Sequence, residues 1–193
     1  MRWLLLFSTL LQAWSPAQVR VVLETELGSI TVEVDAARAP VTAANFLRYV
    51  DGGFYDQGRF HRAVRPATER RTDVPIQVIQ GGINLSRRAA AFLPIPLERT
   101  NATGLTHVDG TISMARDGAD SARSDFFLCV GNQPELDFGG RRNADGQGFA
   151  AFGRVVAGMD VVRKIQAAPV RPETETLDPP ITILRARRAG SPG

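Results

Sequence analysis

Short stretches in which apolar and polar residues alternate recur along most of the chain, and this pattern constrains the fold more than any other feature. A period of two is typical of strands that bury one face. About eight or nine segments are candidates, namely Val19–Thr25, Ile30–Val34, Phe60–Val64, Ile76–Gly82, Phe92–Leu97, Thr111–Ala115, Phe126–Val130, Phe149–Val156 and Ile181–Ala186. Prolines limit Phe92–Leu97 to an edge strand or an extended loop.

Only two segments indicate a helix. The first begins at Pro40, which suits a first helical turn because its missing N–H would have no helical partner there. Its apolar stripe consists of Ala43, Phe46, Leu47 and Val50. Gly52-Gly53 ends this helix, and the second is expected from Gly158 to Ala168.

Strands and helices do not alternate as they would in a parallel sheet. The sequence therefore predicts a mainly β fold, a closed antiparallel barrel with the two helices closing its ends. With 193 residues, of which 44% are hydrophobic, the chain can bury one core. We expect one domain over residues 18–188 and a disordered tail over residues 189–193, with fraying from Arg187 onward.

The N-terminus has the pattern of an export signal. Arg2 precedes an apolar run from Trp3 to Leu11, and Ser15-Pro16-Ala17 supplies small residues before Gln18. The run is too short to span a bilayer, which takes about 20 residues. We expect residues 1–17 to be a cleaved signal peptide, with an uncleaved membrane anchor as the alternative. The mature protein would be secreted into the periplasm, free of the membrane.

Charge and composition exclude several other functions. The net charge is +3, and arginine pairs are scattered among acidic residues, so we expect no nucleic-acid partner. The two histidines, His61 and His107, lack neighbouring ligands at metal-binding spacing, and no Gly-x-Ser-x-Gly motif is present. The single cysteine, Cys129, allows no internal disulfide. We expect a monomer without a metal or another cofactor.

Several short motifs together resemble the cyclophilin-type peptidyl-prolyl cis-trans isomerases. In chain order these are Phe60-His61-Arg62, Gln80-Gly81-Gly82, Gly110–Ala115, Phe126-Phe127-Leu128, Leu136-Asp137 and Phe152–Val155. Each motif is weak alone, but their common order makes the resemblance specific over Val19 to Ala186. The resemblance implies an eight-stranded barrel with two capping helices, a site on its outer face, and substrates that contain an X–Pro bond.

The resemblance also assigns roles to residues. Arg62 would be the catalytic residue, donating a hydrogen bond to the prolyl nitrogen, while Gln80 would orient Arg62 or contact the substrate backbone. Phe127 and Leu136 would line a pocket for the proline ring. Alternation along the strand leaves open whether Phe126 or Phe127 faces this pocket, and the motif selects Phe127. The further substrate-binding residues would be Val78, Ala115, Arg116, Asp125 and Phe149.

This site departs from the family pattern at several positions. Gln77-Val78 stands where Phe-Met is usual, so one aromatic wall of the pocket is missing or comes from elsewhere. The segment from Arg65 to Pro75 is longer than usual and would lie beside the site, narrowing it or presenting arginines to the substrate. Asp125 stands where Gln is common, and its carboxylate could pair with Arg62 and compete with the substrate.

The sequence therefore predicts a prolyl isomerase that assists the folding of exported proteins and acts on proline-containing polypeptides. The alternative is a catalytically weak module on the same barrel that binds proline peptides or acts as a chaperone. A third hypothesis, a small-molecule site inside the barrel, is disfavoured because side chains usually fill barrels of this size.

Overall fold

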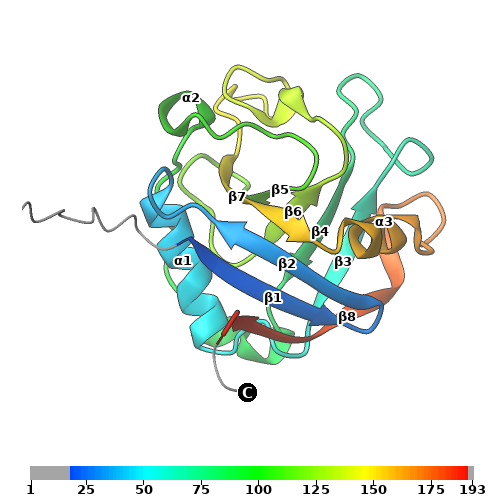
Figure 1. Ribbon diagram of the computed structural model, residues 1–193. Helices are drawn as coiled ribbons and strands as arrows, with labels where there is room; N and C mark the ends of the chain where they lie inside the picture. The colour runs from blue at the N-terminus through cyan, green and yellow to red at the C-terminus, as the bar shows by residue number, and fades with distance from the viewer. Residues whose placement is uncertain (1–17, 191–193) are drawn as a thin grey trace, which may run out of the picture.

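The strands form one closed antiparallel barrel, as the computed structural model of residues 18–190 shows (Figure 1). Around the barrel they follow the order β1-β2-β7-β5-β6-β4-β3-β8, and β8 pairs with β1 to close it. Their bounds are β1 Val19–Thr25, β2 Gly28–Val34, β3 Gly58–Val64, β4 Val78–Gly82, β5 Thr111–Met114, β6 Phe126–Cys129, β7 Ala150–Ala157 and β8 Thr176–Arg188. The predicted eight-stranded barrel is confirmed.

Two helices pack against the barrel from opposite sides (Figure 1). These are α1 Pro40–Asp51 and α3 Met159–Ala167, which lie where the sequence predicts them. The sequence did not predict the short elements, which are α2 Thr100–Thr103 and the 3₁₀ turns η1 Leu85–Ala90 and η2 Pro134–Leu136. No helix within residues 18–190 has both the length and the apolar character needed to cross a membrane.

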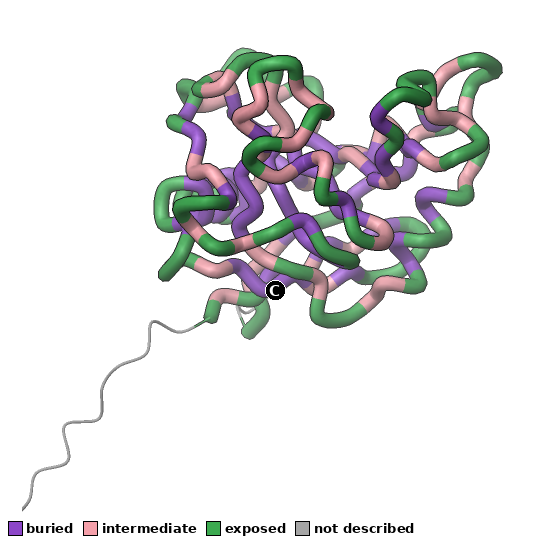
Figure 2. Tube along the Cα trace, turned by 90° about the horizontal axis from the view of Figure 1, so that it is seen from above, coloured by how far each residue is buried: buried purple, intermediate pink, exposed green. Residues whose placement is uncertain are grey.

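Aromatic side chains fill the barrel interior. The ring of Phe46, from α1, lies 5.4, 5.7 and 5.2 Å from the rings of Tyr55, Phe126 and Phe152. Figure 2 shows the buried parts of the chain gathered in the centre, with exposed loops around them. Because these rings and the surrounding aliphatic residues form one buried cluster, the interior is a packed core and does not favour a small-molecule site.

One expectation about the extended segments was wrong. Strand β8 does not fray at Arg187, since Arg187 and Arg188 still pair with β1 and their side chains bind Glu24 and Asp51. Of the two alternatives for the segment 92–97, an edge strand or an extended loop, the structure has the loop, with an isolated bridge at Ile95. The predicted signal peptide, residues 1–17, lies outside the described residues.

Candidate active site

A bulge in strand β3 turns Arg62 toward the outside of the barrel. In a regular strand Phe60 and Arg62 would share a face, because side chains alternate with a period of two. The pairing of β3 with both β4 and β8 shifts between these two residues, so His61 is the extra residue of a bulge. Phe60 therefore stays in the core, while both His61 and Arg62 face an outer groove.

The sheet register sets Arg62, Gln80 and Phe127 in one row. Arg62 pairs with Gln80 across β3 and β4, and Gln80 pairs with Phe127 across β4 and β6. Nη1 of Arg62 donates a hydrogen bond to Oε1 of Gln80 over 3.1 Å. The cation, the amide and the aromatic ring are thus held by three neighbouring strands, and none of the three residues lies on a loop.

Beside this row lies a second apolar cluster, separate from the barrel core. It contains Val64, Ile76, Val78, Phe127, Cys129 and Leu136, with Ala115 and Phe149 packed against it. The rings of Phe127 and Phe149 meet edge to face, with centroids 5.3 Å apart. Phe126 instead points into the barrel core, so Phe127 is the ring at the groove. Ile76 supplies an apolar wall next to Gln77-Val78, where the family has an aromatic residue.

His107 supports Phe127 from behind and has a role that sequence reasoning missed. Its buried ring stacks on Phe127, with centroids 5.8 Å apart. Nδ1 lies 2.7 Å from a carboxylate oxygen of Asp137, and Nε2 lies 3.0 Å from the hydroxyl of Ser113. The sequence signal that could have pointed to this contact was the Leu136-Asp137 motif, because Asp137 directly follows a pocket residue. In residues 18–190 no group of three potential ligands is arranged to hold a metal ion.

Arg116 holds the far wall of the groove through its side chain. Nε donates to the carbonyl of Gly148 over 2.7 Å, and the two terminal nitrogens bind the carboxylate of Asp145 over 2.8 and 2.9 Å. The guanidinium also lies 5.2 Å from the centre of the Phe149 ring. The hydrogen bonds from Arg116 are the main reason that the pKa of Asp145 is lowered to about 2. The side chain of Arg116 is thus fully engaged in contacts within the protein.

The carboxylate that binds Arg62 is Glu175, and Asp125 lies elsewhere. Oε2 of Glu175 is 2.7 Å from Nε and 2.6 Å from Nη2 of Arg62. Asp125 instead lies 3.8 Å from Nε2 of His61, next to Gly82, where a Cβ would come within 2.5 Å of its carboxylate. Burial lowers the pKa of His61, although the charge of Asp125 opposes this. No sequence motif marks Glu175, which is 113 residues from Arg62.

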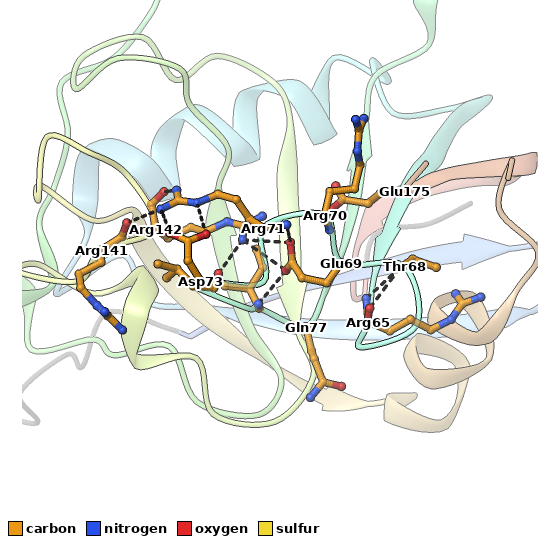
Figure 3. A network of polar contacts seen from close by, with 12 residues as sticks. Arg65, Thr68, Glu69, Arg70, Arg71, Asp73, Gln77, Arg141, Arg142 and Glu175 are labelled. Atoms are coloured by element: carbon orange, nitrogen blue, oxygen red, sulfur yellow. Dashed lines mark hydrogen bonds and ion pairs between the residues drawn. The ribbon is translucent and has the colours of Figure 1, made fainter. Parts of the chain in front are cut away.

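The long segment after β3 is tied to the loop that precedes β7 (Figure 3). Nη1 of Arg142 binds both carboxylate oxygens of Glu69 over 3.2 Å and the carbonyl of Val74 over 2.7 Å. Arg71 reaches back and donates to the carbonyls of Arg141 and Arg142. Arg71, from this segment, and Arg142, from the loop before β7, thus fasten one wall of the groove. The side chain of Arg65 is also bound, to the carbonyls of Gln166 and Ala168.

All nine residues that the sequence assigned to the site line one groove of about 870 Å³. They are Arg62, Val78, Gln80, Ala115, Arg116, Asp125, Phe127, Leu136 and Phe149. The apolar cluster occupies one end, and the groove continues past Gly82 to Arg88 and Arg123. It therefore combines an anchored cation with an apolar socket, an arrangement suited to a ring-shaped apolar group next to a hydrogen-bond acceptor.

Comparisons with known proteins identify the family of this chain. Residues 20–188 match the family model described as cyclophilin type peptidyl-prolyl cis-trans isomerase/CLD. The chain is 37% identical over 186 residues to peptidyl-prolyl cis-trans isomerase A of Dickeya dadantii, covering 92% of this chain and 90% of that protein. It is also 37% identical over 164 residues to a peptidyl-prolyl cis-trans isomerase of Acinetobacter baylyi, covering 83% and 78%.

Solved structures show the same fold. A cyclophilin-type peptidyl-prolyl cis-trans isomerase of Cryptosporidium parvum superposes with a TM-score of 0.70 at 20% identity, covering 91% of this chain and 99% of that one. A second structure, described as that protein in the presence of the dipeptide Ala-Pro, also gives a TM-score of 0.70, at 19% identity, and covers 89% and 99% of the two chains.

Proposed function

This chain belongs to the cyclophilin-type peptidyl-prolyl cis-trans isomerase family and has that isomerase activity, and from this premise we propose that it binds proline-containing polypeptides in the outer groove, with Arg62 as the catalytic residue. The observation that carries the proposal is the row of Arg62, Gln80 and Phe127 across three strands. It places a fixed cation beside an apolar socket in one groove.

The chemistry needs both parts of this site. Rotation about a peptide bond crosses a barrier of about 18–20 kcal/mol, because the nitrogen lone pair is shared with the carbonyl. In the twisted state the lone pair is localised on the prolyl nitrogen and can accept a hydrogen bond. A group that donates to it therefore stabilises the transition state more than the planar ground states. Arg62 is such a donor, since a guanidinium offers five N–H groups in a planar fork.

One hydrogen bond is not sufficient for the whole rate enhancement. A charge-assisted hydrogen bond contributes about 1.5–3 kcal/mol, whereas a thousandfold acceleration requires about 4 kcal/mol. The remainder comes from holding the proline ring still while the acyl side rotates. Phe127, Leu136, Ile76 and Phe149 form the wall suited to that task. Gln80 keeps Arg62 aligned with the substrate.

Isomerisation of a short X–Pro peptide, followed by protease-coupled cleavage or by NMR exchange, tests this proposal. We expect Arg62→Ala to lose most of the activity. Arg185→Ala removes a cation from an exposed position on β8 and is expected to leave the rate unchanged. An Arg62→Ala protein that is folded and as fast as the wild type would refute the role of Arg62. Wild-type protein that binds the peptide without exchanging it would instead support the binding-module alternative.

We also propose that the protein is exported and assists the folding of periplasmic proteins. The support is the sequence of residues 1–17, in which a short apolar run after Arg2 precedes small residues at the expected cleavage position. Trp3 and Trp14, the only two tryptophans, both lie in this segment. The mature protein from a periplasmic extract should therefore begin at Gln18 and show no tryptophan fluorescence. An intact mass that includes residues 1–17 would contradict cleavage.

A further inference from the structure

The backbone of Glu175 is fixed next to the catalytic arginine. Glu175 ends the connection between α3 and β8, directly before Thr176, which pairs with Arg62 across β8 and β3. The carbonyl of Glu175 also accepts a hydrogen bond from the backbone N–H of Ala63 over 2.9 Å. The side chain of Glu175 therefore starts from a rigid position beside the β3 bulge.

Both carboxylate oxygens of Glu175 are bound. Oε2 accepts a hydrogen bond from Nε of Arg62 over 2.7 Å and forms an ion pair with Nη2 of Arg62 over 2.6 Å. Oε1 accepts from the backbone N–H of Arg70 over 3.3 Å, and Figure 3 shows Arg70 and Glu175 side by side. The side chain of Glu175 is only 11% exposed, against 32% for Arg62. The carboxylate thus joins the catalytic arginine, strand β8 and the long segment after β3.

This contact leaves part of the guanidinium free to act. An arginine has five N–H donors in a planar fork. Glu175 accepts the Nε–H and forms an ion pair with Nη2, and Gln80 accepts one hydrogen of Nη1. Within the described residues, the second N–H of Nη1 and the N–H groups of Nη2 donate no hydrogen bond. The arginine is therefore gripped along one edge by Glu175 and at Nη1 by Gln80, while the end of its fork can still donate to a substrate.

We propose that Glu175 is a positioning residue for Arg62, a role that rests on the proposed function of this groove. A long, exposed arginine must lose its rotamer freedom and its water when it meets the twisted bond. Glu175 completes this ordering before the substrate arrives, so the donor does not reorganise during the reaction. The carboxylate of Glu175 offsets part of the positive charge of Arg62. It binds the guanidinium on its Nε side, however, and leaves N–H groups at the end of the fork for the substrate.

Kinetics of Glu175 variants provide the first test. In Glu175→Ala we expect kcat/KM for an X–Pro peptide to fall about tenfold, through kcat, with KM changed less than twofold because the apolar pocket is intact. In Glu175→Gln the loss should be smaller, since the amide oxygen can still accept from Nε. The matched control is Glu173→Gln, which removes the same charge from an exposed position in the same connection and should change nothing.

Measurements in the Arg62→Ala background distinguish a positioning role of Glu175 from a merely structural one. If Glu175 acts through Arg62, adding Glu175→Ala to Arg62→Ala should cause no further loss of activity. If the double variant loses a further tenfold, Glu175 acts otherwise and the proposal is overturned. Circular dichroism melts establish that each variant is folded at the assay temperature.

A second measurement uses the wild-type protein and does not depend on the stability of any variant. The ¹⁵N–¹H signal of Arg62 Nε, assigned by its loss in Arg62→Lys, should exchange slowly with water because Glu175 holds that proton. Exchange as fast as that of an exposed arginine would overturn the inference. If Arg62→Ala is inactive but Glu175→Ala is as active as the wild type or faster, the positioning role of Glu175 is overturned. The proposed function of the groove then stands. Full activity of Arg62→Ala would instead remove the proposed function itself.

Discussion

Arg142→Ala tests how the groove wall is held, and the neighbouring Arg141 offers a matched control. The pair of Arg142 and Glu69 is buried, with side chains 10% and 3% exposed. Removal of one partner from a buried pair costs about 3–5 kcal/mol when the other is left with nothing. Glu69 keeps hydrogen bonds from the backbone N–H groups of Ile76 and Arg71, over 2.9 and 2.8 Å. The loss should therefore be nearer to that of a single charged hydrogen bond, about 2 kcal/mol.

Such a loss should be visible in both stability and binding. For a domain of this size, 1 kcal/mol shifts Tm by about 2–4 °C, so Arg142→Ala should lower Tm by about 4–8 °C. Because Glu69 also holds the backbone of Ile76, a wall residue, KM for an X–Pro peptide should rise while kcat changes little.

Arg141→Ala removes an exposed arginine that pairs with Glu135, with side chains 69% and 30% exposed. Water and salt screen exposed ion pairs, so they contribute little, and the Tm of this variant should stay close to that of the wild type. Thermal melts by circular dichroism and peptide kinetics on the wild type, Arg142→Ala and Arg141→Ala test this difference. Equal Tm values for the two arginine variants, or an Arg142→Ala protein with unchanged KM, would refute the reasoning.

Three further predictions follow from the described contacts. Phe127→Leu should keep the fold but raise KM several-fold, because it removes the ring that Phe149 and His107 contact; an unchanged KM for an X–Pro peptide would exclude Phe127 from the pocket. The Cys129 thiol is buried and burial raises its pKa, so iodoacetamide at pH 8 should modify only the unfolded protein, as mass spectrometry would show; rapid labelling of the folded protein would contradict this. Since the folded pKa of Asp145, about 2, lies below the unfolded value of about 3.9, its stabilising contribution is complete above about pH 4 and is lost as the pH falls toward 2. An Asp145→Asn protein should therefore lose less stability than the wild type over that interval, and identical acid-unfolding curves would argue against the Arg116 contact.

Local sequence patterns were sufficient to predict most of the fold and the residues that line the groove. Alternation placed seven strand candidates at or within a few residues of the observed strands, and Pro40 marked the start of α1. The motifs selected nine residues that line one groove. The C-terminal strand was the weakest prediction, because Arg187 and Arg188 owe their order to β1, Glu24 and Asp51, which are far away in the sequence.

The amino-acid sequence alone determined the barrel, the two main helices and the residue types of the site, because periodicity and short motifs are local properties. Only the tertiary structure decided how Arg62 is presented and held. The bulge at His61, the support of Phe127 by His107 and the pairing of Arg62 with Glu175 join strands and loops that are distant along the chain. Such contacts depend on register and closure of the whole barrel, so no local pattern can reveal them.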